Sequence, residues 1–141
     1  MWKILITLGI SLLFSCGGDD SKSNISISFD PIRFCTQAGV DGLCSTSRSQ
    51  ISQGTTRIYS STQVNFNTTA GSFNFNWYLV NESGCRTKLS TDSVVPQVDG
   101  QQTLTGYYMN TGGLTKGLYE LEIVFNSSDT SESALAQFSV N

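Results

Sequence analysis

The sequence predicts an all-β protein in which about seven or eight short strands form an antiparallel sandwich. Two observations lead to this prediction. From residue 24 onward no window places apolar residues at i, i+3, i+4 and i+7, whereas several windows alternate strictly between apolar and polar residues. Serine, threonine, asparagine, glutamine and glycine fill most polar positions, as in secreted β proteins with many turns. A chain of 141 residues, 38% of them hydrophobic, can build one packed core.

The N-terminal strand is expected to be interrupted. Apolar residues alternate over 25–29, but proline has no N–H to donate, so Asp30-Pro31 should break the ladder before pairing resumes over 32–34. Residues 35–54 contain several glycines and serines and predict a long loop. The next strand, of about ten residues, places three apolar side chains on one face: Ile58, Val64 and Phe66.

The strongest alternation in the chain lies at 73–80, which predicts a strand across the centre of the core with Trp77 facing inward. Gly84 and Cys85 mark the turn that follows. Further strands are predicted over 87–89, 93–98, 103–109, 119–125 and 134–140.

The N-terminus has the features of a signal peptide. Lys3 supplies a positive charge, and the apolar run over 4–14 is too short to cross a bilayer, which requires about 20 residues in a helix. Small Ser15 then precedes Cys16. A transmembrane anchor is therefore not expected at this end of the chain.

The ending Leu13-Phe14-Ser15-Cys16 resembles the lipobox of bacterial lipoproteins, in which cleavage precedes the cysteine and the thiol is lipidated. The resemblance implies that Cys16 holds the mature chain to a membrane through more than one acyl chain, because a single chain binds only marginally. Gly17 departs from the aspartate that retains enterobacterial lipoproteins in the inner membrane, and Asp19-Asp20 resembles the acidic export tether of Bacteroidetes lipoproteins. The implied location is the outer membrane, facing the periplasm or the cell surface.

These features divide the chain into a signal peptide (1–15), a lipidated cysteine with a flexible tether (16–23) and a folded domain (24–141). If the lipobox interpretation were wrong, four Asn-x-Ser/Thr sequons would suggest a glycosylated eukaryotic protein instead. Their asparagines are Asn24, Asn67, Asn81 and Asn126.

Three segments carry a second resemblance. The sequence FNFNWYLV at 73–80, followed by LTKGLYELEIVF at 114–125 and ALAQFSV at 134–140, resembles strands C, F and G of immunoglobulin-like domains in bacterial envelope proteins. The resemblance covers roughly residues 55–141. It implies an immunoglobulin-like β-sandwich.

The same resemblance assigns two core markers. Trp77 corresponds to the strand C tryptophan, and Tyr119 corresponds to a tyrosine corner whose hydroxyl returns to the backbone upstream. The second cysteine of antibody domains should follow two residues after that tyrosine, but Leu121 stands there. The inter-sheet disulfide is therefore expected to be absent, so apolar packing must join the sheets.

Three cysteines remain in the mature chain beyond Cys16, and the bacterial envelope permits disulfides. Cys35 and Cys44 lie in one predicted loop, which makes them the favoured pair. Cys85 is the alternative partner for either of them, because the strand ends share a pole of the sandwich. The thiol left over is expected to be inert and partly buried.

Composition argues against several function classes. Only 13% of residues are charged and the net charge is −3, so no basic field exists to hold a nucleic acid. The chain has no histidine, which removes the usual base for a serine or cysteine nucleophile and the usual zinc ligand. Asp41-Gly42 and Asp99-Gly100 read as turns rather than calcium loops. Glu120 and Glu122 read as the solvated face of a strand, so neither an enzyme nor a cofactor is expected.

Tyrosines offer a possible binding face. Tyr59, Tyr78 and either Tyr107 or Tyr108 can point away from the core, depending on register, and outward aromatics can bind sugars or a protein. The loop over 35–54 is the other candidate, since long loops carry function. We therefore expect a non-catalytic binding or structural module with a protein or glycan partner; the alternative is a cell-surface carbohydrate-recognition or adhesion module.

Overall fold

The computed structural model describes residues 24–141, so the predicted signal peptide, Cys16 and the tether lie outside the described residues. The described part consists of nine strands joined by turns and loops, and none of its segments is a helix long and apolar enough to span a membrane. The strands are β1 (Ile27–Phe29), β2 (Arg33–Cys35), β3 (Gln50–Ile51), β4 (Arg57–Phe66), β5 (Ser72–Val80), β6 (Arg86–Val94), β7 (Gly100–Met109), β8 (Gly117–Asn126) and β9 (Ser131–Val140).

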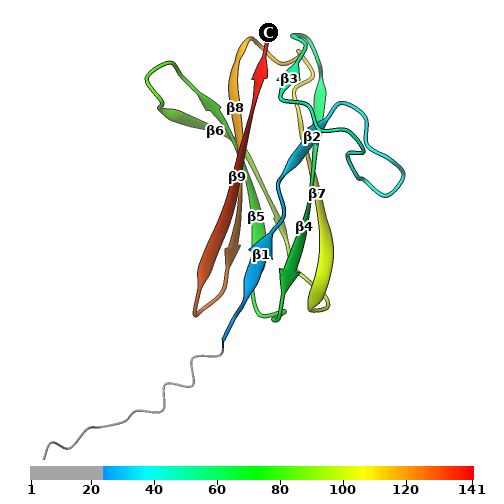
Figure 1. The fold of residues 1–141 in the computed structure, drawn as a ribbon. Helices are drawn as coiled ribbons and strands as arrows, with labels where there is room; N and C mark the ends of the chain where they lie inside the picture. The colour runs from blue at the N-terminus through cyan, green and yellow to red at the C-terminus, as the bar shows by residue number, and fades with distance from the viewer. Residues whose placement is uncertain (1–23) are drawn as a thin grey trace, which may run out of the picture.

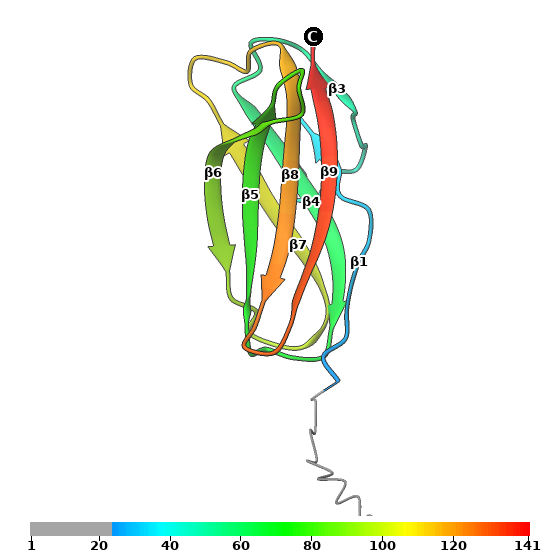
Figure 2. The same ribbon diagram turned by 90° about the vertical axis from the view of Figure 1, so that its left-hand side faces the viewer.

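The strands form two sheets that face each other (Figures 1 and 2). In the first sheet, β4 pairs antiparallel with β1 and β2 along one edge and with β7 along the other. The second sheet has the order β3-β9-β8-β5-β6. The predicted interruption of the N-terminal strand is confirmed, because Ile27 pairs with Phe66 and Arg33 with Ser61, with Asp30-Pro31 between the two ladders.

One apolar core fills the space between the sheets. Trp77 on β5 is 1% exposed and packs on Phe34 of the opposite sheet, with ring centroids 6.1 Å apart. Alternation places every second residue of β4, β5 and β8 in this core. Its buried members include Ile58, Val64, Phe66, Phe73, Phe75, Leu104, Leu114, Leu121, Ile123, Phe125, Phe138 and Val140.

Tyr119 lies at the start of β8, where its ring stacks on Phe138 with centroids 5.3 Å apart. Its hydroxyl donates a hydrogen bond to the carbonyl of Thr115, four residues upstream, at 3.0 Å. Two residues further along, Leu121 is fully buried. A buried apolar side chain therefore occupies the position at which the resemblance would place a cysteine.

Three details of the predicted strands are wrong. The segments predicted as 87–89 and 93–98 form one strand, β6, which ends at Val94. The predicted loop 35–54 contains β3, a two-residue strand that pairs parallel with β9, so the orientation is not purely antiparallel. The strand count is nine rather than seven or eight, because the interrupted N-terminal strand counts twice and β3 adds one.

Candidate binding surface

The four candidate tyrosines do not share one face, so this prediction needs correction. Tyr59 and Tyr107 are direct partners across β4 and β7, on the outer side of the first sheet. Tyr78 lies on the outer side of the second sheet, beside Arg86. Tyr108 turns inward and packs on Trp77 with centroids 6.0 Å apart. Tyr107 and Tyr108 are adjacent in one strand, so the pleat must send them to opposite sides.

Tyr59 and Tyr107 form a platform with two further residues. Their ring centroids are 6.3 Å apart, and the guanidinium carbon of Arg57 lies 5.0 Å from the centroid of Tyr107. Arg57 Nη1 donates to the Tyr59 hydroxyl at 3.2 Å, and Nη2 contacts Met109 Sδ at 3.2 Å. We call the side chains of Arg57, Tyr59, Tyr107 and Met109 the tyrosine platform. Tyr107 is 51% exposed and Met109 47% exposed, so the platform is open to solvent.

Arg57 carries a positive charge that no acid of residues 24–141 neutralises. The ion pairs of this part of the chain both involve Arg86, on the opposite sheet. The hydrogen bond to Tyr59 is the main cause that raises the pKa of Arg57 above its ordinary value. The platform is therefore two aromatic faces with a fixed, accessible cation.

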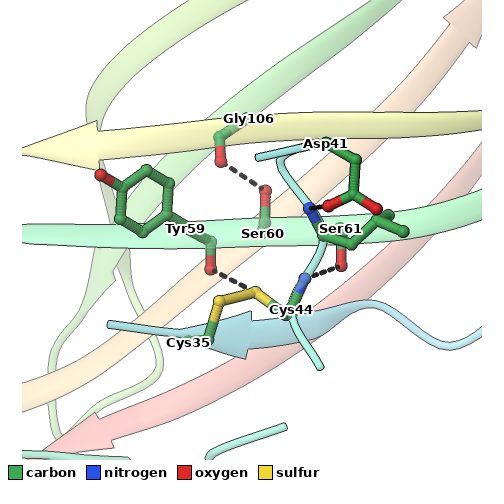
Figure 3. Close-up of a disulfide and its surroundings, with 8 residues drawn as sticks. Cys35, Asp41, Cys44, Tyr59, Ser60, Ser61 and Gly106 are labelled. Atoms are coloured by element: carbon green, nitrogen blue, oxygen red, sulfur yellow. Dashed lines mark hydrogen bonds between the residues drawn. A yellow bond between two sulfur atoms is a disulfide. The ribbon is translucent and has the colours of Figure 1, made fainter. Parts of the chain in front are cut away.

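The disulfide between Cys35 and Cys44 confirms the favoured pairing. Cys35 lies opposite Tyr59 in the register of β2 and β4, and the loop it closes crosses the outer side of the first sheet (Figure 3). The N–H of Cys44 donates to Ser61 Oγ at 3.0 Å, and Cys44 Sγ lies 3.7 Å from the carbonyl oxygen of Tyr59. The two candidates from the sequence, the loop and the tyrosines, thus meet on one face.

Two hollows flank the platform. Threonine and glycine residues supply most of the remaining lining in both, and the second hollow adds the Asp92 carboxylate. The hollow on the Arg57 side is lined by the platform residues Arg57, Tyr59 and Met109 together with Thr36, Gly54, Thr55 and Thr56. The hollow on the other side is lined by Tyr59 and Tyr107 together with Gly42, Asp92, Thr105 and Gly106.

The tip of the disulfide loop forms one wall of the second hollow. Gly42 adopts φ +78°, which a residue with a side chain rarely adopts. A Cβ at this position would lie 3.0 Å from Thr105 Cγ2. Glycine therefore allows the loop to lie directly against β7. Sequence reasoning identified Asp41-Gly42 as a turn, and Asp41 Oδ1 indeed accepts from the N–H of Leu43 at 3.1 Å.

Cys85 differs from its prediction, because its thiol is free and exposed rather than partly buried. It lies in the β5–β6 turn, where its N–H donates to Asn81 Oδ1 at 2.8 Å. The carbonyl of Cys85 accepts from the N–H of Asn81 at 2.9 Å. These bonds close the turn through the backbone and leave the side chain outside the core.

Glu120 also differs from its prediction, because only 5% of it is exposed. Arg86 Nε lies 2.7 Å from Glu120 Oε1, and Gln137 Nε2 donates to Oε2 at 2.7 Å. Arg86 also contacts Glu122 at 3.4 Å and lies over the Tyr78 ring at 3.8 Å. β8 lies between β9 and β5, and its outward acids are covered by Gln137 of β9 and by Arg86, which reaches across from β6. One guanidinium therefore ties both acids into an ion-pair network.

The side chains of the described residues do not form a candidate metal site. Among residues 24–141, no group of three or more histidine, cysteine, aspartate or glutamate side chains could hold a metal ion. The platform itself offers aromatic faces, one guanidinium and hydroxyl groups, which are groups for binding.

Comparison with known proteins gives no family. No family model matches the chain, and no curated protein matches it. Three solved structures show partial likeness. A β-glucuronidase from Parabacteroides merdae is 13% identical over 81% of this chain and 14% of its own, with a TM-score of 0.48. An alkylpurine DNA glycosylase from Pseudomonas fluorescens is 16% identical over 82% of this chain and 30% of its own (TM-score 0.47), and a β-glucosidase from Listeria innocua is 10% identical over 83% of this chain and 16% of its own (TM-score 0.46). The chain spans less than a third of each, and likeness at this level assigns neither fold family nor activity.

Proposed function

We propose that this chain is a lipid-anchored, non-catalytic binding module of the bacterial outer membrane, built as an immunoglobulin-like β-sandwich. The lipobox-like Leu13–Cys16 segment supports the anchor. Two facing sheets around Trp77, with the Tyr119 hydroxyl on the Thr115 carbonyl, support the immunoglobulin-like assignment.

The observation that carries the binding function is the position of the tyrosine platform. β1 lies at one pole of the domain, beside the end of β4, whereas β4 begins at Arg57 and β7 ends at Met109 at the other pole (Figure 1). In the proposed orientation, with Cys16 at the lipid surface, the platform lies near the end of the domain that is distant from the membrane. An exposed aromatic and cationic patch at that end suits a partner outside the bilayer.

Two observations support a role without catalysis. The chain contains no histidine to act as a base. Its most closely spaced acids on one strand face, Glu120 and Glu122, are both paired with Arg86. The tyrosine platform favours binding over purely structural support, and its sugar-compatible chemistry keeps carbohydrate recognition or adhesion as the alternative form of this function.

Mass spectrometry of the mature protein, purified from a bacterial host in detergent, tests the anchor. We expect the chain to begin at Cys16 and to carry acyl chains, and the Cys16→Ser variant to leave the membrane fraction. An uncut leader, or native protein that dissolves without detergent, would contradict the proposal.

The binding function is tested with immobilised full-length mature protein and solubilised envelope components. Tyr107→Ala should lose captured material, because it removes the most exposed ring of the platform. Tyr78→Ala is the matched control, since Tyr78 lies on the opposite sheet. Equal recovery by the wild type and both variants would contradict a role for the platform.

A further inference from the structure

The tyrosine platform and the hollow beside it bring together three kinds of group: two aromatic faces, an arginine without an acidic partner in residues 24–141, and the Asp92 carboxylate that lines the hollow. We propose that it binds a carboxylate-bearing saccharide, with the sugar ring on Tyr59 and Tyr107 and the acid group on Arg57. This inference rests on the proposed binding function and names its ligand class.

The tyrosine rings are spaced for one sugar ring. Their centroids lie 6.3 Å apart and their planes are tilted by 55°, so the pair forms a shallow, open trough rather than a closed stack. The negative face of an aromatic ring attracts the partly positive C–H groups of a pyranose. One six-membered ring can contact both tyrosines at this spacing.

Arg57 supplies the acid-binding group. Its two terminal nitrogens contact the Tyr59 hydroxyl and Met109 Sδ, which holds the guanidinium over the platform, 5.0 Å from the Tyr107 centroid and 5.9 Å from the Tyr59 centroid. A guanidinium has five N–H donors, and those not used by the platform can bind a carboxylate, often in bidentate fashion. Since Arg57 forms no ion pair with an acid of residues 24–141, a ligand carboxylate would meet no competing acid there.

Asp92 makes the two ends of the platform chemically different. It lines the hollow on the side of the rings away from Met109, together with Thr105 and the backbone of Gly106. A carboxylate accepts hydrogen bonds from sugar hydroxyls but repels a ligand acid. The acid group is therefore directed to the Arg57 end, where Thr55 and Thr56 line the other hollow.

The site is held in place before any ligand arrives. The Cys35–Cys44 disulfide fixes the loop that carries Gly42 against Thr105. Tyr59 and Tyr107 sit within paired strands rather than on loops, near the start of β4 and the end of β7. A preformed site loses little conformational freedom on binding, which favours weakly binding ligands such as sugars.

A saccharide fits these groups better than a peptide. The hollows beside the rings are lined mainly by threonine, glycine and Asp92, with Met109 the one aliphatic side chain on the platform. Peptide addition to a strand edge relies on main-chain hydrogen bonds, and among the described strands β7 has a free edge that could offer them, but that mode uses neither the tyrosine faces nor the Arg57 guanidinium. Aromatic faces with a polar rim and one cation match an acidic sugar.

The test is calorimetric titration of the full-length mature protein in detergent micelles. The probes are oligomers of galacturonate, alginate and hyaluronan, each compared with the same oligomer after its carboxylates are reduced to alcohols. We expect at least one acidic oligomer to bind about tenfold or more tightly than its reduced form, because reduction removes the charge-assisted contact with Arg57.

Variants assign the contacts. Arg57→Gln should bind the acidic and reduced forms equally, and Tyr107→Ala should lose both, while Tyr78→Ala should behave like the wild type. Circular dichroism checks that each variant is folded. Equal binding of acidic and reduced forms by the wild type, or a charge preference that survives Arg57→Gln, would overturn the inference.

The outcomes separate this inference from the proposed function. If no oligomer binds while Tyr107→Ala still loses a captured envelope protein, the ligand is a protein, so the saccharide inference fails and the binding function stands. If no oligomer binds and capture is unaffected by Tyr107→Ala, both fail.

Discussion

Arg86 stabilises the buried carboxylate of Glu120 on the outer side of the second sheet. Its side chain is 36% exposed, whereas that of Glu120 is 7% exposed. We expect Arg86→Met to lower the free energy of unfolding by about 1–3 kcal/mol, because it leaves the Glu120 carboxylate buried with a single neutral donor. Urea unfolding measures the change.

A double mutant tests that reason. Adding Glu120→Gln to Arg86→Met should recover part of the loss, since a neutral amide costs less to bury than an unpaired charge. Lys88→Met is the control, because Lys88 also lies near the Tyr78 ring, at 5.6 Å, and forms no ion pair within residues 24–141. It should change stability by less than about 0.5 kcal/mol. Equal losses for Arg86→Met and Lys88→Met would contradict this role.

Two tyrosines should make the fold sensitive to alkali. Burial, the largest cause for both, raises the pKa of Tyr78 and of Tyr108 above the ordinary value of 10.0, and the charge of Glu122 adds to the effect on Tyr78. The folded chain therefore keeps phenol protons that the unfolded chain releases. Stability should be complete below pH 10 and fall as the pH rises through the raised pKa values.

Absorbance of the phenolate during a pH titration checks this expectation. Of the five tyrosines, at least two should ionise late. Tyr78→Phe and Tyr108→Phe should each remove one late step and weaken the alkaline loss of stability. If the variant that combines Tyr78→Phe and Tyr108→Phe lost stability at the same alkaline pH as the wild type, the expectation would be contradicted.

Among the elements, the disulfide loop links stability to the candidate site. Removing the bond with Cys35→Ala and Cys44→Ala frees a loop whose ends are 9 residues apart. The chain-entropy relation gives a loss of about 2–3 kcal/mol in the free energy of unfolding. Ligand binding should weaken as well, because Gly42 would no longer be held against Thr105. Thermal unfolding together with the saccharide titration measures both effects.

Cys85→Ser is the matched control for the disulfide. Its thiol is exposed and unpaired, so stability and binding should stay within error of the wild type. If the loop variant kept wild-type binding, the loop would not form part of the site.

The sequence predicts the strands that have one buried face more closely than those that do not. Residues of β4, β5 and β8 alternate between core and exterior, so the predicted strands match closely. In β6, an edge strand, most residues are exposed, so no alternation marks its length and the sequence predicts two shorter strands there. The two residues of β3 are defined by pairing with β9, a long-range contact that local composition does not report.

The tyrosine platform was only partly predictable for the same reason. Arg57 stands two residues before Tyr59, and Met109 stands two after Tyr107, a spacing that places each pair on one face. What joins the pairs is the register of β4 against β7, which sets Arg57 opposite Met109 and Tyr59 opposite Tyr107. Register depends on the whole sheet. The sequence alone therefore indicates the tyrosines as candidates but does not indicate that Arg57 joins them.

At the scale of the whole molecule, both sheets contribute to one core and should unfold together. Residues 24–141 contain a single tryptophan, Trp77, which contacts Phe34 across the core. We expect this fragment to unfold in one cooperative transition, with Trp77 fluorescence and far-ultraviolet circular dichroism changing at the same urea concentration. Separate transitions would show that the sheets are independent.

The length of the strands sets how far the tyrosine platform stands from the N-terminal pole. β4 has ten residues, so Arg57 and Phe66 are roughly 30 Å apart, about the thickness of a bilayer's hydrocarbon core. In the proposed orientation, lipid headgroups and short surface groups end well below the platform. Long, charged polymers can then be captured without approaching the lipid. Because the platform stands more than one Debye length above the surface, salt screens the repulsion between such a polymer and an anionic bilayer.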